Sequence, residues 1–164
     1  MIVRNVNYYR GFAICTGSIT KGDSLVNPNN PINAEYNQLL YLVIGSGKAN
    51  DVDLPSAGRM YDLSQLKGQP ITYQGVSETS AWVAFNPLKQ DKELDVEILK
   101  GESERTLLDD VNDIIVVPID GNVSVGSTTI ETLKSGRLPA GKSAVLTVPT
   151  EAVCAIVKVV DSSV

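Results

Sequence analysis

The stretch "GRLPAGKSAVLTVP", Gly136 to Pro149, contains Gly-x-x-x-x-Gly-Lys-Ser, the pattern of a phosphate-binding loop. Such a loop needs a helix that begins at the Lys-Ser pair, because the backbone N–H groups of the helix N-terminus hold the phosphates. Here "SAVLTVP" follows Lys142, and its apolar and polar residues alternate as in a strand that ends at proline. The segment therefore predicts a glycine turn and a strand, and we interpret the match over Gly136–Ser143 as accidental.

Short apolar strands separated by turn residues recur along the whole chain. Examples are "GFAIC", "LLYLVI", "ITYQ", "AWVAF", "LDVEIL", "DIIVVPI", "AVLTV" and "AVCAIVKVV". This density of strands and turns predicts an all-β sandwich or barrel. One helical turn is predicted at "SERTLLDDV", capped by Ser103. Asparagine and proline predict a long loop over Thr20–Asn37, and a charged break at Asn86–Leu94 separates two halves.

The two halves share a pattern of strands and glycine turns. "LLYLVIGSGKA" and "IIVVPIDGNVSV" each end a strand at a glycine, Gly45 and Gly121. Further on, "LKGQPITYQGVSETSAWVAF" pairs without gaps with "PAGKSAVLTVPTEAVCAIVK". The identities are few, so this repeat depends on pattern and spacing.

Charge and composition exclude several classes of partner. The chain has 164 residues, a net charge of -5 and a pI near 4.7, so it would repel nucleic acid and anionic lipid. Its apolar runs are too short to span a bilayer and its N-terminus lacks a signal peptide. We expect a protein kept in the cytoplasm and not secreted. Cys15 and Cys154 are expected to be small buried thiols, and whether they are close enough for a disulfide stays open.

The absence of histidine restricts the chemistry. Without an imidazole, Ser-His-Asp and Cys-His nucleophile systems cannot form, and most zinc, copper and iron sites lose their usual ligands. A carboxylate-only calcium or magnesium site stays open, but "DDVND" and "DVD" lack the spacing of a calcium loop. We therefore expect no metal, no cofactor and no enzyme activity.

The pattern of "QLLYLVIGSGKA", followed by a glycine turn and "GQPITYQGVSETSAWVAF", resembles the two motifs of the cupins, small β-barrels of the jelly-roll kind. The resemblance implies two compact barrels, over residues 1–88 and 93–164. It places the cupin glutamate at Gln38, the histidine pair around Asn33 and the last histidine near Glu78. In the second half the corresponding positions are Ile114, beside Asp113, and Glu151. The resemblance thus implies that every metal-binding position is lost or altered.

Three functions fit a barrel without a reactive centre. The first is a structural protein of a virion or other large assembly, which implies a homo-oligomer or protein partners. The second is a metal-free module that binds a sugar or other small polar ligand in the first barrel. Its candidate ligand-binding residues are Asn33, Tyr36, Gln38, Tyr41, Tyr73, Glu78 and Trp82. The third is an enzyme that uses Glu78 and Tyr73 as base and acid, and we rank it last.

Aromatic residues also have a simpler interpretation. Tyr41 and Trp82 lie in predicted strands, where aromatic side chains commonly pack into a β core, and we prefer this role for both. Tyr8 and Tyr9 are adjacent in a predicted strand, so they point to opposite faces. One of the two is therefore expected to be exposed or covered by another subunit.

Overall fold

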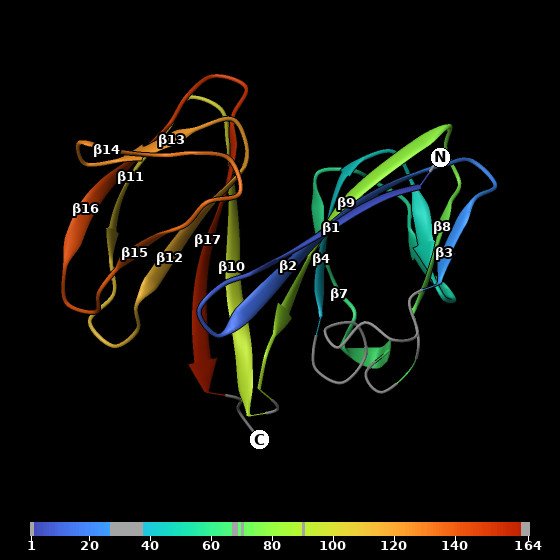
Figure 1. The fold of residues 1–164 in the computed structure, drawn as a ribbon, viewed down its shortest axis with the longest axis horizontal. Coiled ribbons are helices and arrows are strands. Elements are labelled where there is room, and N and C mark those ends of the chain that lie inside the picture. The colour runs from blue at the N-terminus through green and yellow to red at the C-terminus, as the bar shows by residue number, and fades with distance from the viewer. Residues whose placement is uncertain (1, 27–37, 67–68, 70, 90, 162–164) are drawn as a thin grey trace. The chain divides into compact units, whose positions relative to one another are not determined.

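The structure is a computed structural model that describes residues 2–26, 38–66, 69, 71–89 and 91–161. Two compact units make up the chain, Met1–Lys92 and Glu93–Val164. In each unit the strands form two sheets (Figure 1), which confirms the predicted all-β class. In the described ranges, no helix is long and apolar enough to cross a membrane.

The first unit has a five-stranded and a four-stranded sheet, in the orders β1-β2-β9-β4-β7 and β3-β8-β5-β6. The strands of the larger sheet are β1 (Ile2–Tyr8), β2 (Phe12–Thr20), β9 (Thr79–Pro87), β4 (Leu39–Ile44) and β7 (Arg59–Asp62). The strands of the smaller sheet are β3 (Ser24–Val26), β8 (Thr72–Gly75), β5 (Gly47–Ala49) and β6 (Val52–Leu54). A short 3-10 helix, η1 (Ser64–Leu66), follows β7.

The second unit repeats this order without a counterpart of β1. Its sheets have the orders β10-β17-β12-β15 and β11-β16-β13-β14. The strands of the first of these sheets are β10 (Lys92–Lys100), β17 (Val153–Asp161), β12 (Ile114–Asp120) and β15 (Gly136–Leu138). The strands of the other are β11 (Ser103–Leu108), β16 (Ser143–Val148), β13 (Val123–Val125) and β14 (Thr128–Ile130).

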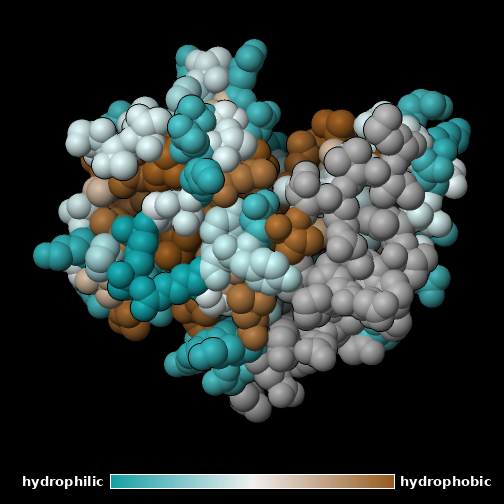
Figure 2. Space-filling view, in the orientation of Figure 1, coloured by the Kyte–Doolittle hydropathy of each residue, from teal (hydrophilic) through white to brown (hydrophobic). Residues whose placement is uncertain are grey.

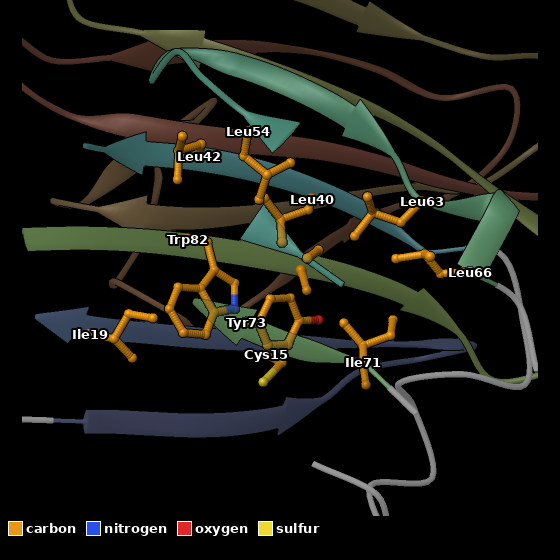
Figure 3. Packing of buried hydrophobic residues seen from close by; sticks show 13 residues of the cluster. Cys15, Ile19, Leu40, Leu42, Leu54, Leu63, Leu66, Ile71, Tyr73 and Trp82 are labelled. Carbon is orange, nitrogen blue, oxygen red and sulfur yellow. The ribbon is translucent and has the colours of Figure 1, made fainter. Parts of the chain in front are cut away.

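Each unit has its own apolar cluster, to which both of its sheets contribute. Alternate residues of each strand point into it, because successive side chains of a strand point to opposite faces. The first cluster consists of Ala13, Cys15, Ile19, Leu40, Leu42, Ala49, Leu54, Leu63, Leu66, Ile71, Tyr73, Trp82 and Ala84 (Figure 3). The second consists of Leu99, Leu107, Ile114, Val116, Val123, Ile130, Leu146, Val148, Ala152, Cys154 and Ile156. Each large aliphatic side chain buried in this way stabilises the fold by about 1.5–3 kcal/mol.

The segment after Lys142 is a strand, as predicted. Ser143–Val148 forms β16 and pairs with β11 along its whole length. Before it the chain turns at Gly141, whose φ of 81° is left-handed and whose N–H donates to the carbonyl of Asp109 (2.8 Å). No helix N-terminus follows the Lys-Ser pair, so this segment cannot hold phosphates as a phosphate-binding loop does.

The helical turn predicted at "SERTLLDDV" is wrong. Ser103–Leu108 forms strand β11, with Leu107 buried in the second cluster and Leu108 exposed. The chain turns before it at Gly101 and Glu102, which have φ values of 27° and 45°. The Ser103 hydroxyl therefore donates to the carbonyl of Lys100 (2.9 Å) within this turn and does not cap a helix.

The structure also tests the predictions for the two adjacent tyrosines, the two cysteines and the long loop. Tyr8 is 61% exposed, whereas the ring of Tyr9 stacks on Phe12 at 5.1 Å, which confirms that the two tyrosines differ in exposure. Cys15 and Cys154 are both buried, as expected. Of the loop predicted over Thr20–Asn37, Ser24–Val26 forms strand β3, and residues 27–37 lie outside the described residues.

Candidate functional site

The two units can be compared position by position because their sheets have the same order. Strands β4 and β12 occupy the same place, and each ends directly before a glycine with a left-handed backbone, Gly45 (φ 80°) and Gly121 (φ 79°). Counted back from these glycines, Leu40 of β4 corresponds to Val116 of β12. Both side chains belong to the interior cluster of their unit. The strand pairings on either side of β4 and of β12 then define the other corresponding positions of the two units.

An aromatic ring of the first unit has no counterpart in the second. Leu40 faces Tyr61 on β7, and the Tyr61 ring packs against the first cluster. Val116 faces Gly136 on β15. A Cβ atom at Gly136 would meet Cδ1 of Ile130, so the Ile130 side chain lies where a larger residue would begin. The space of the tyrosine ring is therefore left without a side chain from β15.

Two further aromatic positions are also small in the second unit. The rings of Tyr73 and Trp82 stack in the first cluster, with centroids 4.9 Å apart (Figure 3). The corresponding ladders place Leu146 at the position of Tyr73 and Cys154 at the position of Trp82. Burial raises the pKa of the Cys154 thiol to about 12, so it stays protonated near neutral pH. Cys154 is thus a packing residue and not a nucleophile.

A cleft of about 460 Å³ opens in the second unit between strands β14 and β15. These are the edge strands of its two sheets. The floor of the cleft consists of Val116, Val125, Ile130 and Leu138, all of which belong to the interior cluster or pack against it. Figure 2 shows hydrophobic residues of this unit, on the left of the view, reaching the surface between hydrophilic ones. The cleft therefore lies directly over the apolar interior of the unit, and Val125 and Leu138 are its partly exposed apolar residues.

The connection between β14 and β15 forms the rim of the cleft and is fixed by hydrogen bonds. The N–H of Leu133 donates to the carbonyl of Pro118 (2.7 Å), and the hydroxyl of Thr132 donates to the carbonyl of Gly121 (2.8 Å). Leu133 has a φ of 63°, which turns the chain at this point. Because both bonds end on β12 or on the glycine after it, the rim has a defined position over the cleft.

Polar side chains are available at this rim. Thr128, Glu131, Lys134 and Ser135 line the cleft and are exposed. Within the described residues, Lys134 forms no ion pair. Its ammonium group is therefore available to a ligand, together with the Thr128 and Ser135 hydroxyls and the Glu131 carboxylate.

Arg137 also lines the cleft, but its charge is used elsewhere. It alternates with Gly136 and Leu138, so its side chain points to the opposite face of β15. There Nε donates to Oδ2 of Asp113 at 2.7 Å, while Oδ1 of Asp113 accepts the N–H of Ala140 at 3.0 Å. The Arg137 guanidinium is thus engaged by Asp113, and Lys134 is a cation at the rim.

Three of the residues predicted to bind a ligand meet in the first unit. Nε2 of Gln38 donates to Oδ1 of Asn86 (2.7 Å), and the Tyr73 hydroxyl donates to Oε1 of Gln38 (2.8 Å). Trp82 stacks on Tyr73 in the same interior. The cavity against Tyr73 and Trp82 measures about 10 Å³, at the lower limit for a single water molecule.

The other predicted residues do not join this group. Tyr41 is buried but faces Val83, on the face of β4 opposite to Gln38. Glu78 is exposed, and Asn33 and Tyr36 lie outside the described residues. The ligand-binding role predicted for this set stays a prediction.

The residues present do not fit a metal centre of the cupin type. The chain has no histidine, and no group of three or more Cys, Asp or Glu side chains suited to a metal occurs in the described part of the chain. Gln38, where the resemblance places the cupin glutamate, is a neutral amide held by Tyr73 and Asn86. The corresponding Ile114 is an apolar residue buried in the second cluster.

Comparison with solved structures identifies the fold. YhhW from Escherichia coli, a bacterial pirin also solved with nickel(II), matches with a TM-score of 0.64 and 11% identity over 100% of both chains. A cupin 2 conserved barrel domain protein from Leptotrichia buccalis matches with a TM-score of 0.55 and 12% identity, over 98% of this chain and 89% of its own. The chain has the cupin-like jelly-roll fold. A mutant of oxalate decarboxylase OxdC from Bacillus subtilis matches with a TM-score of 0.61 and 7% identity, over 94% of this chain and 70% of its own. No family model and no curated protein matches the cupin-like chain.

The cupin-like fold corrects two expectations. A structural role in a virion or other large assembly is wrong, because the similar structures are a cupin barrel protein, a pirin and a decarboxylase. The exclusion of enzyme activity is wrong as well, since the same fold occurs in oxalate decarboxylase. Lack of imidazole removes one set of catalytic groups, but a fold by itself assigns no reaction. The expected homo-oligomer, the expected protein partners and the exclusion of nucleic acid and membrane stay predictions.

The cleft of the second unit is the feature that sequence reasoning missed. Its signal is the distribution of aromatic residues, all of which lie at or before Phe85. A second half without any Phe, Tyr or Trp fills the same strand order with smaller side chains. A candidate site is therefore expected in the second unit, where aromatic rings are missing.

Proposed function

We propose that the chain is a metal-free, cupin-like module that binds a small organic ligand in the cleft between β14 and β15. The observation that supports this is the cleft itself, with about 460 Å³ of space, an apolar floor and four polar side chains at its rim. Ligand sites of proteins are typically clefts of about 300–1,000 Å³ with apolar walls and a few polar groups that orient the ligand. The cleft of the second unit has this composition.

The apolar floor would supply most of the affinity and the rim the orientation. Covering the partly exposed side chains of Val125 and Leu138 removes apolar surface from water, which contributes about 25 cal/mol for each Å². Hydrogen bonds from the rim replace those with water, so they add specificity more than affinity. A rim held by backbone hydrogen bonds also loses little entropy when a ligand binds.

A thermal-shift panel of sugars, amino acids, hydroxy acids and aromatic acids tests the proposal. A ligand that binds only the folded protein stabilises it by about 2.7 kcal/mol at a hundredfold excess over Kd, so Tm rises. The substitution Gly136→Leu places a side chain in the cleft at the position that faces Val116, and we expect it to abolish the shift.

The matched control is Val145→Leu, which adds apolar volume on an exposed strand position outside the cleft. We expect its response to the panel to equal that of the unmodified protein. If every stabilising compound keeps its shift in Gly136→Leu, the cleft is not the binding site and the proposal is wrong.

A further inference from the structure

The first unit has an aromatic ring at the position where β15 of the second unit has no side chain. The Tyr61 ring lies on β7, beside Leu40, and packs against the first cluster. Its hydroxyl donates to the carbonyl of Ser56 (2.9 Å) and accepts the N–H of the same residue (3.1 Å). The guanidinium carbon of Arg59 lies 5.5 Å from the ring centre, within the range of a cation–π contact. An apolar floor, a loop backbone and a cation thus hold one aromatic ring.

The second unit has the corresponding surroundings without the ring. Val116 takes the place of Leu40, Gly136 takes the place of Tyr61, and the Ile130 side chain lies over Gly136. Lys134 lies two residues before Gly136, as Arg59 lies two residues before Tyr61, and it lines the cleft. The loop that joins the two edge strands is held in place in both units, through Tyr61 in the first and through backbone and threonine hydrogen bonds in the second.

We infer that the cleft takes a ligand with a planar aromatic ring and a hydrogen-bonding substituent, and that Lys134 lies against the ring face. This inference rests on the proposed function and names its class of ligand. The ring lies on the cleft side of Ile130 and Gly136, and its polar substituent points toward the connection between β14 and β15.

A sugar fits this cleft less well. Saccharides present flat apolar faces that proteins commonly cover with aromatic side chains, and the second unit has no aromatic residue. An aromatic ligand needs no such partner, because it supplies its own π-face to the ammonium of Lys134. The apolar floor then covers the opposite side and the edge of the ring.

Phenol and cyclohexanol are matched probes for this class, since they have the same number of heavy atoms and one hydroxyl each. In a calorimetric or NMR titration of the full chain, we expect phenol to bind more tightly than cyclohexanol. The substitution Lys134→Gln removes the cation and keeps much of the side-chain length, so it should weaken phenol binding roughly two- to fivefold. Cyclohexanol binding should stay unchanged. Equal loss for both probes, or no loss for phenol, would overturn the role of Lys134.

A reciprocal pair of substitutions tests the position of the ring. Gly136→Tyr supplies a ring of the chain's own, and we expect it to abolish phenol binding, with no gain in Tm because its Cβ must displace Cδ1 of Ile130. Tyr61→Gly opens the same position in the first unit, and phenol should then restore part of the lost Tm. If Tyr61→Gly does not fold, Tyr61→Ala removes the same ring and retains a Cβ. Phenol that still binds Gly136→Tyr at full affinity would contradict the assignment.

The two proposals fail in different ways. If panel compounds bind and Gly136→Leu blocks them, but phenol does not bind or binds no better than cyclohexanol, the ligand class is wrong and the binding site stands. If Gly136→Leu blocks no compound, both the proposed binding site and the proposed ligand class are wrong.

Discussion

The two units have the same order of strands and different interiors. The first packs the stacked rings of Tyr73 and Trp82 into its cluster, and the second has Leu146 and Cys154 at the corresponding positions. Strand order follows from alternation and turns, which both halves retain. The free volume inside each unit follows from the size of its side chains, and the two units differ in that size. A jelly-roll unit can therefore lose its rings, keep its topology and gain a cleft.

The two interiors also differ in the polar side chains that they bury. In the first unit, Gln38 is buried with Tyr73 and Asn86 as hydrogen-bond partners. At the corresponding position the second unit has Ile114, which needs no partner. A buried amide requires its neighbours in fixed places, because an unmade hydrogen bond costs about 1–3 kcal/mol. The interior of the first unit thus depends on hydrogen-bond partners at this position, whereas that of the second depends on apolar packing.

The largest effect is expected from Trp82→Ala. Removing a buried aromatic side chain costs about 3–5 kcal/mol through lost burial and the cavity left behind. At the corresponding position of the second unit, Cys154→Ala should cost only about 1 kcal/mol. Urea unfolding followed by circular dichroism measures both. Equal losses would mean that the two interiors depend on these positions to the same degree, contrary to the comparison.

A pair of glycine substitutions gives a smaller effect. A Cβ at Gly17 would collide with the Trp82 ring, and a Cβ at Gly136 would collide with Cδ1 of Ile130. The tryptophan is confined by its stack on Tyr73, so Gly17→Ala should cost about 1–3 kcal/mol as an overpacked site. The end of Ile130 can turn into the cleft, so Gly136→Ala should cost less than about 1 kcal/mol. Unfolding free energies of the two variants check this order, and a reversed order would show that the cleft leaves Ile130 no room.

Much of the fold was predictable because its signals are local. The alternation in "SAVLTV" specifies strand β16 without reference to any other segment. The helical turn at "SERTLLDDV" was wrong because a serine before a polar run also suits a hairpin, and only the pairing of β11 with β16 decides between them. The local sequence pattern therefore predicts a strand or a helix well where a single hydrophobic period dominates.

The candidate site was less predictable because it depends on register between distant strands. That Val116 faces Gly136, and that Ile130 lies over that glycine, follows from ladders and packing that a single sequence does not reveal. Gln38, Tyr73 and Trp82 could be chosen by residue type, but the hydrogen bond that joins Gln38 to Tyr73 crosses between segments far apart in the chain. Only the absence of aromatic residues after Phe85 was visible beforehand.

The units also differ in how they use an ion pair. In the second unit, Nζ of Lys158 lies 2.9 Å from Oδ2 of Asp109, and both side chains are partly covered. Hydrogen bonds from the backbone of Asn112, the Lys158 ammonium and the backbone of Val111 lower the pKa of Asp109 from 3.8 to about 2. In the first unit, the Lys48–Asp53 pair is longer, at 3.7 Å, and the Asp53 side chain is 72% exposed.

The smallest expected effect is the pH dependence of this pair. Because the pKa of Asp109 is lower in the folded protein, its contribution is full above about pH 4 and is lost as the pH falls toward 2. Asp109→Asn should therefore reduce the unfolding free energy at pH 6, and its difference from the unmodified protein should shrink between pH 4 and 2. Asp53→Asn, which breaks the exposed pair, should change the unfolding free energy at pH 6 by less than about 1 kcal/mol. Urea titrations across this range measure both, and a constant difference for Asp109→Asn would mean that its charge does not stabilise the second unit.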